Sequence, residues 1–150
     1  MNSLLMSQLF DETTFYSQFQ RDLKACRREV IIESPYITLK RASGIINTLE
    51  QLVSRFVAVY IITRQPEGHD IKMKAQAEKV IQKFESMGIQ VFVTSNFSHR
   101  KLAILDRKIL WEGSLNILSQ TQSREIMRRI DSKQLSQECF DFVGLGRFIK

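Results

Sequence analysis

Residues 56–63, FVAVYIIT, carry the strongest strand signal in the chain. The run is almost continuously apolar and rich in β-branched side chains, which is typical of a strand buried on both faces. On its N-terminal side, residues 42–54 place Ile, Leu and Val at helical spacing, and residues 29–34 (EVIIES) repeat the strand pattern. On its C-terminal side, an amphipathic helix is predicted over 72–87 and a third strand over 89–94.

This alternation of strands and helices determines the fold class that we expect. A strand–helix–strand unit within one sheet forms a parallel pair through a right-handed crossover. A further helix is predicted over 11–28, before the first strand, from Phe and Leu residues at helical spacing. We therefore expect an α/β/α sandwich with a mixed, mostly parallel central sheet.

The pattern changes after residue 94. Two short apolar runs, 101–105 and 109–112, flank a polar turn and predict a β-hairpin. Residues 126–130 predict one more strand and residues 131–142 a closing helix. No repeat or linker is visible in the sequence, so residues 1–150 are interpreted as a single domain, with a domain of a larger protein as the open alternative.

The composition narrows the functional class. Lys and Arg number 22 and Asp and Glu 16, and the net charge of +6 favours a polyanionic partner, either nucleic acid or an anionic membrane surface. No apolar run approaches the ~20 residues that span a bilayer, and the first residues lack the basic region of a secretory signal. Cys26 and Cys139 lack metal-ligand spacing, so we expect mostly buried thiols, no cofactor and a cytoplasmic location.

The residues that can carry chemistry are concentrated in one stretch. His99, Lys101 and Asp106 have the spacing H-x-K-x4-D, and after six further residues the chain continues with the run GSLN at 113–116. An imidazole near neutral pH can act both as a nucleophile and as a proton donor, which are two of the groups that phosphodiester cleavage needs. Asp106 is too far along an extended run to reach the same phosphate, and accepting backbone N–H bonds at the hairpin fits its spacing better. We keep it in the motif as a catalytic candidate, ranked below His99, Lys101, Asn116 and Glu125.

The other motif residues supply hydrogen-bond donors. Residues i and i+2 of an extended segment point to the same side, so His99 and Lys101 can face one phosphate, and Ser114 and Asn116 can face it from the neighbouring strand end. A hydroxyl and a carboxamide can donate to the non-bridging oxygens. The alternative is that Ser114 and Asn116 are ordinary turn residues after a glycine.

Glu125 follows the motif. Its carboxylate is predicted to accept the second imidazole N–H and to hold His99 in the useful tautomer. The alternative is a surface ion pair with Arg124 or Arg128.

Positive charge is concentrated around the motif. Between residues 96 and 130 there are seven Lys and Arg residues and three acidic residues. This concentration predicts a track for a nucleic-acid backbone, with a merely solvated face as the alternative. The candidate contacts are Arg100, Arg107, Lys108, Arg124 and Arg128. Tyr36 is a candidate for base stacking, whereas Trp111 lies in an apolar strand and is expected in the core.

The combined pattern HxK(x)4D(x)6GSxN resembles the HKD signature of the phospholipase D superfamily. Ser34-Pro35-Tyr36, after a strand, and Glu125, after the motif, are similar to features of the small single-motif bacterial endonucleases of that family. The resemblance implies a phospholipase D-like fold and a covalent phosphohistidine intermediate that water then attacks. It implies no metal.

The family resemblance also implies two motifs for each active centre, one histidine attacking phosphorus and the other protonating the leaving group. His69 stands in H-x-x-K and does not match, so the chain has one motif. The resemblance therefore implies a homodimer with a single active site across a two-fold axis.

Three functions fit these observations. The first is a nuclease acting on DNA or RNA, without stable membrane association. The second is a lipid phosphodiesterase that docks on an anionic membrane through an apolar face made by Leu4, Leu5, Met6, Leu9 and Phe10. The third is a nucleic-acid-binding, nuclease-like module of a larger DNA-processing system.

Overall fold

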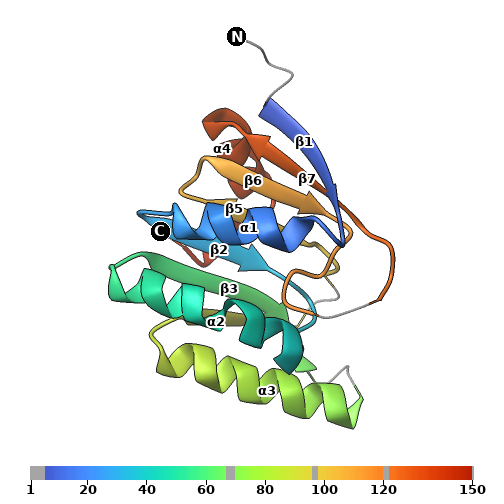
Figure 1. The fold of residues 1–150 in the computed structure, drawn as a ribbon. Helices are drawn as coiled ribbons and strands as arrows, with labels where there is room; N and C mark the ends of the chain where they lie inside the picture. The colour runs from blue at the N-terminus through green and yellow to red at the C-terminus, as the bar shows by residue number, and fades with distance from the viewer. Residues whose placement is uncertain (1–5, 67–69, 96–97, 120–121, 150) are drawn as a thin grey trace.

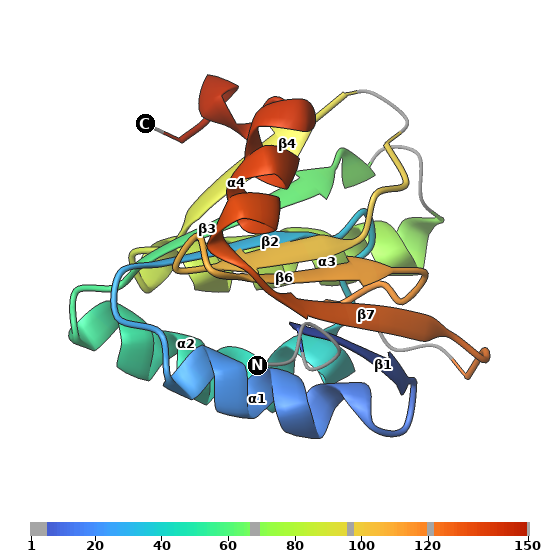
Figure 2. The same cartoon turned by 90° about the horizontal axis from the view of Figure 1, so that it is seen from above.

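The computed structural model describes residues 6–66, 70–95, 98–119 and 122–149. These residues form a seven-stranded sheet in the order β1-β7-β6-β5-β2-β3-β4, with helices on both faces (Figures 1 and 2). The elements in chain order are β1 (Ser7–Asp11), α1 (Phe15–Lys24), β2 (Glu29–Glu33), α2 (Leu39–Ser54), β3 (Ala58–Arg64), α3 (Ile71–Ser86), β4 (Gln90–Thr94), β5 (Leu102–Leu105), β6 (Ile109–Gly113), β7 (Ile126–Asp131), α4 (Lys133–Phe142) and the short 3-10 helix η3 (Leu145–Arg147).

The first half of the chain confirms the predicted crossovers. Strand β2 pairs with β3, and β3 with β4, both in parallel, and α2 and α3 connect them. The Asp70 side chain accepts a hydrogen bond from the backbone N–H of Met73 and so caps the start of α3.

The second half corrects one part of the predicted fold class. The sheet is mixed, as expected, but four of its six strand pairs are antiparallel, so "mostly parallel" is wrong. The physical reason is the length of the connections. Only residues 106–108 join β5 to β6, and a connection this short can make only a hairpin.

Strand β1 is the element that the sequence interpretation missed. Ser7–Asp11 pairs with β7 at the edge of the sheet, whereas the predicted helix began at Asp11 and the observed helix begins at Phe15. The Asp11 carboxylate accepts hydrogen bonds from the backbone N–H groups of Thr13 and Thr14 and forms the turn between the two elements. A short edge strand with one half-covered face carries a weak hydrophobic signal.

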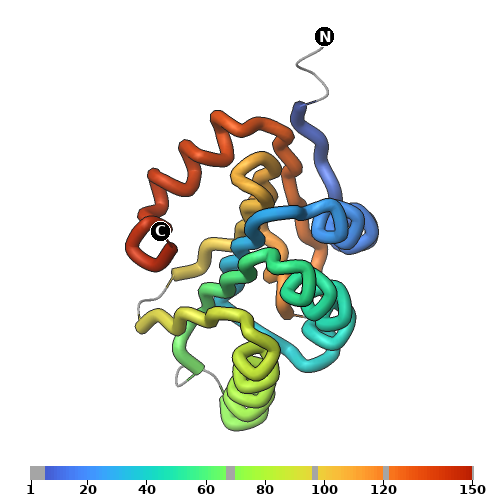
Figure 3. The backbone as a smooth tube through the Cα atoms, turned by 90° about the vertical axis from the view of Figure 1, so that its left-hand side faces the viewer, coloured from blue at the N-terminus to red at the C-terminus, as the bar shows by residue number. Residues whose placement is uncertain are grey.

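The larger core lies between the sheet and the helices α1, α2 and α3 (Figure 3). Phe15, Phe19 and Trp111 are fully buried there and their rings pack against one another. Trp111 is therefore a core residue, as predicted. Its indole N–H donates to the buried carboxylate of Asp22 over 2.9 Å, and Arg129 from β7 donates to the same carboxylate over 2.7 Å.

Helix α4 and η3 cover the opposite face of the sheet. Their buried side chains, Phe140 and Leu145 among them, pack on Ile31, Leu102 and Leu110. Cys26 is buried and Cys139 is half-buried, and both are free thiols. Burial raises the pKa of the Cys26 thiol to about 12, with the nearby carboxylates of Asp106 and Asp22 adding to the effect.

Candidate active site

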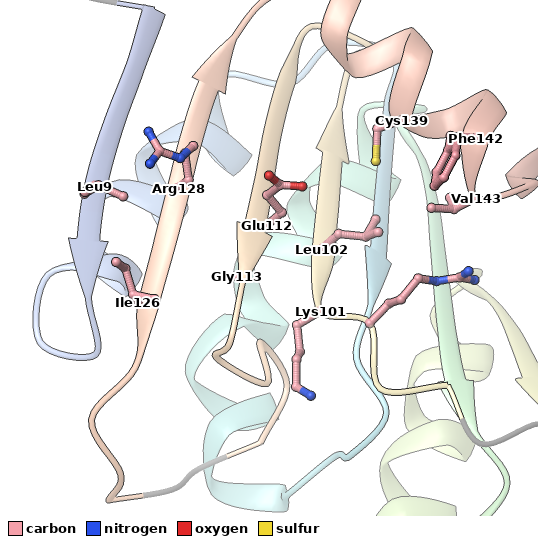
Figure 4. Close-up of a pocket in the computed structure, with 11 residues that line it drawn as sticks. Leu9, Lys101, Leu102, Glu112, Gly113, Ile126, Arg128, Cys139, Phe142 and Val143 are labelled. Atoms are coloured by element: carbon pink, nitrogen blue, oxygen red, sulfur yellow. The ribbon is translucent and has the colours of Figure 1, made fainter.

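The motif residues come together because of the strand directions. The start of β5, the end of β6 and the start of β7 lie at the same end of the sheet, because the three strands are successively antiparallel. Glu33, the last residue of β2, pairs with Leu102, so the carboxyl ends of the parallel strands point the same way. Lys101, immediately before β5, and Gly113, the last residue of β6, mark this edge (Figure 4).

The loop that carries His99 is fixed by a buried carboxylate. Arg100 donates from Nε to Glu33 Oε1 over 3.1 Å and from Nη2 to Glu33 Oε2 over 3.3 Å, and the Glu33 side chain is only 4% exposed. The Ser98 hydroxyl donates to the same carboxylate over 3.4 Å. Glu33 therefore holds the residues on both sides of His99, whose own side chain is exposed.

Glu33 is a site residue that the sequence interpretation missed, and Arg100 was assigned differently. Arg100 was a candidate nucleic-acid contact, whereas the structure pairs it with Glu33. The sequence feature that could have identified Glu33 is its position as an acidic residue at the end of the apolar run EVIIE. A carboxylate at a buried strand end requires a partner.

Lys101 turns back towards the histidine. Its Nζ donates to the backbone carbonyl of His99 over 2.6 Å. The backbone N–H of Gly113 donates to the Lys101 carbonyl over 3.3 Å and joins the two strand ends. The ammonium of Lys101 is thus held beside the His99 loop at the exposed edge.

Gly113 is required by a close approach of two strands. A Cβ atom added at this position would lie 2.1 Å from the Ile126 carbonyl oxygen and 2.9 Å from the Met127 Cα. A side chain at residue 113 would therefore force the two strands apart in this register. The next residue, Ser114, completes the link, because its N–H donates to the Ile126 carbonyl and its Oγ accepts from the Ile126 N–H.

Glu125 lies within the same group. The hydroxyls of Ser114 and Ser123 next to its carboxylate hold the pKa of Glu125 below its usual range, and the positive charge of Lys101 acts in the same direction. Its backbone N–H donates to the Glu12 carboxylate over 2.7 Å. Lys101, Ser114 and Glu125 therefore form one electrostatic unit.

Three predicted partners of Glu125, namely Arg124, Arg128 and His99, do not contact its carboxylate in the described residues. Among the described residues, no ion pair joins Glu125 to Arg124 or Arg128, and no hydrogen bond joins it to His99. Orientation of His99 by Glu125 remains a prediction.

Asn116 lies in a loop that two other elements anchor. The Tyr16 hydroxyl donates to the Ile117 carbonyl over 2.8 Å, and the Ser34 hydroxyl accepts from the Leu118 N–H over 3.1 Å. Ser34 belongs to the Ser-Pro-Tyr segment, so that segment anchors the motif loop through the Leu118 N–H. The Asn116 side-chain oxygen is buried and has no hydrogen-bond partner among the described residues.

Asp106 lies at the far end of β5 from Lys101. Its carboxylate accepts hydrogen bonds from the backbone N–H groups of Arg27, Arg28 and Glu29 over 2.8–2.9 Å. A strand rises about 3.3 Å per residue, so five residues separate Asp106 from Lys101 by roughly 17 Å. Its contacts are the structural ones expected of it, and it does not join the group around Lys101.

Arg107 and Lys108 lie in the same hairpin turn as Asp106. Arg107 pairs with Glu29 over 2.5 Å and stacks over the Phe140 ring, with 3.6 Å from its Cζ to the ring centroid. The predicted track placed these two basic residues beside the motif, and the structure places them at the opposite end of the hairpin. Arg107 and Lys108 are close to Lys101 in the sequence, but the four residues of β5 separate them in space.

The remaining basic candidates lie nearer the site. Arg124 is exposed and precedes Glu125, and Arg128 is exposed on β7, where its Nη1 donates to the Ser7 hydroxyl over 2.5 Å. Arg64 donates to the Tyr36 hydroxyl over 3.3 Å. His69, which was expected to take no part, lies outside the described residues.

The described ranges lack two further features. They contain no group of three or more His, Cys, Asp or Glu side chains that could hold a metal ion. In the same ranges, no helix is both long and apolar enough to cross a membrane.

Comparisons with known proteins place the chain in a family. Residues 19–142 match the family model described as "Cardiolipin synthase, PLD-like domain". The chain therefore belongs to the phospholipase D-like family, as the HKD pattern indicated. No curated protein matches the chain.

Solved structures of low sequence identity share the fold. The chain is similar to Nuc, a phospholipase D family member from Salmonella typhimurium, with a TM-score of 0.75, 18% identity and coverage of 91% of this chain and 90% of that one. NucT from Helicobacter pylori gives a TM-score of 0.67 at 17% identity, with 91% of each chain covered. The phosphatidylserine synthase of Haemophilus influenzae gives 0.64 at 16% identity, with 88% of this chain and 37% of that chain covered.

Proposed function

We propose that the protein is a metal-independent phosphodiesterase that cuts DNA or RNA through a phosphohistidine intermediate, in an active site shared by two copies of the chain. The observation that carries the proposal is the gathering of His99, Lys101, Ser114 and Glu125 at one exposed edge of the sheet. The group combines a nucleophile, an ammonium, a hydroxyl and a carboxylate, which is the set that phosphoryl transfer requires.

In the proposed first step, a ring nitrogen of His99 attacks phosphorus and the bond to the leaving oxygen breaks. The partner's His99, in its protonated form, gives its proton to that oxygen. Lys101 donates to the non-bridging oxygens, and Ser114 does the same after its hydroxyl proton turns from Glu125 to the phosphate, so that both stabilise the charge that develops there. In the second step, water attacks the phosphohistidine, the partner's His99 takes the proton from water, and His99 leaves phosphorus.

The homodimer follows from the number of motifs. The chain has two histidines, and only His99 stands in an HxK motif, so a second acid–base group of the same kind must come from a second copy. A two-fold axis beside the exposed His99 would bring the two imidazoles together through identical surfaces.

Charge favours nucleic acid as the substrate. The net charge is +6, and Arg124 and Arg128 lie exposed close to Glu125 and Ile126 at the site edge. The lipid alternative relies on an apolar face near the N-terminus. Of that face, Leu9 is 56% exposed, whereas Phe10 packs against the buried Trp111 ring at a centroid distance of 5.0 Å and supports the core instead.

The test is cleavage of end-labelled single-stranded and duplex DNA and RNA in excess EDTA. We expect the wild-type protein to cut at least one of the four substrates. His99→Ala should reduce the rate by at least about 10³-fold while the protein stays folded and dimeric in sedimentation. His69→Ala, which changes the other histidine, is the matched control and should keep full activity.

Either of two results would overturn the proposal. One is equal cleavage by the wild type and His99→Ala, which would remove the histidine mechanism. The other is no cleavage of any of the four substrates together with salt-insensitive binding, because contacts to phosphates make binding depend on salt.

A further inference from the structure

A groove runs along the sheet face next to the proposed active site. Its floor is a row of cross-strand neighbours, because Leu9 pairs with Arg128, Arg128 with Glu112, and Glu112 with Leu102. These side chains point to the same face of the sheet (Figure 4). Trp111, the neighbour of Glu112 along β6, is buried on the other face. The volume of the groove is about 550 Å³, which is within the range of small-molecule sites.

The groove exists because α4 covers only part of this face. The helix packs over β5 and the middle of the sheet and leaves the outer strands β7 and β1 open on this side (Figure 2). Phe142, at the end of α4, forms the opposite wall and is 89% exposed. Leu9 and Ile126 across the groove are 56% and 53% exposed.

The groove is lined by apolar, cationic and acidic side chains. Lys101 and Arg100 line the end next to the loop that carries His99, and Arg128 lines the floor. Arg100 is paired with Glu33, so Lys101 and Arg128 are the cations that face a ligand along an otherwise apolar channel. One carboxylate, Glu112, lies between them on β6. An acyl chain would gain nothing from these charges and would have to desolvate Glu112.

A nucleotide matches each part of this lining. The phosphates of the chain match the cations, and the flat face of an unpaired base matches the exposed Phe142 ring. The Glu112 carboxylate can accept hydrogen bonds from the amino groups that bases carry at their edges. Because Lys101 belongs to both the groove and the site, a base bound here would be attached next to the phosphate at His99.

We propose that this groove binds an unpaired base of the nucleotide next to the scissile phosphate, with Phe142 as the stacking surface. The inference rests on the proposed nuclease function and adds a preference for single-stranded nucleic acid. A base paired in a duplex cannot enter a groove of this kind without leaving its stack.

Phe142→Ala tests the proposal, and Phe56→Ala is the matched control. Phe56 is also an exposed phenylalanine, at 93%, but it lies between α2 and β3, at the end of the sheet opposite to the site. The substrates are two single-stranded oligonucleotides that differ only by one abasic residue next to the mapped cleavage position. We expect the wild type and Phe56→Ala to cut the intact oligonucleotide roughly tenfold better than the abasic one.

In Phe142→Ala that preference for the base should fall to near one, mainly through a higher KM. Three results would overturn the groove alone while cleavage continues. The first is an unchanged preference for the base in Phe142→Ala. The second is loss of dimerisation of Phe142→Ala in sedimentation, which would make the groove a subunit contact. The third is loss of Phe142→Ala binding to anionic vesicles, which would make the groove a lipid site. Absence of both cleavage and binding in the wild type would instead overturn the proposed function and the groove with it.

Discussion

At the scale of single residues, Glu125 is the group whose state the structure specifies most clearly. Ser114, Ser123 and Lys101 all favour its ionised form, so its pKa in the folded protein is below the ordinary value of 4.5. A carboxyl group with a lowered pKa stabilises the fold above its unfolded pKa and loses that contribution as pH falls through the folded pKa.

Glu125→Gln should therefore change the pH dependence of stability. We expect the difference in urea midpoint between wild type and Glu125→Gln to be constant above pH of about 4.5 and to disappear at lower pH. Ser123→Ala, which removes one donor, should move the loss of this difference to higher pH. A difference that stays constant down to pH 3, or that grows on acidification, would contradict the electrostatic unit.

Among single residues, the sequence correctly predicted the positions of those whose spacing along a strand follows from the proposed chemistry. The positions of His99, Lys101 and Ser114 at strand ends follow from the i and i+2 pattern and the strand boundaries. The ion pair of Glu33 with Arg100 was not predictable, because 67 residues separate the partners and only the antiparallel pairing of β2 with β5 brings them together.

At the scale of elements, the edge that holds the site depends on how closely β6 and β7 approach. Gly113→Ala should force these strands apart, destabilise the protein by roughly 1–3 kcal/mol, and lower cleavage because Ser114 moves with the strand end. The matched control is Gly44→Ala. Gly44 lies inside α2 with no atom within 4 Å of an added Cβ, so this change should stabilise the protein by about 0.5–1 kcal/mol.

Thermal or urea unfolding and cleavage rates check both changes. Equal effects of the two substitutions would show that the β6–β7 approach has no special role.

Helices and strands were easier to predict from the sequence than the way in which the strands pair. The parallel units follow from local periodicity, whereas the antiparallel half depends on short connections and on an edge strand, Ser7–Asp11, with little hydrophobic signal.

At the scale of the whole molecule, the fold divides its charge between two ends. Asp106 and Arg107 close the hairpin at one end through contacts with residues 27–29, while His99 and Lys101 lie at the other end. A motif that is continuous in sequence is therefore split in space. This division is why Asp106 contacts the backbone of residues 27–29 and lies away from the group around Lys101.

The phosphohistidine intermediate can be trapped by rapid quenching of the reaction with a ³²P-labelled single-stranded oligonucleotide in excess EDTA, followed by denaturing separation of the protein. We predict that the phosphoryl group, with the attached strand, remains covalently bound to the protein and that peptide mapping places it on His99. No labelled protein should form with His99→Ala. Cleavage by the wild type without any label on the protein, or label on a residue other than His99, would contradict the account.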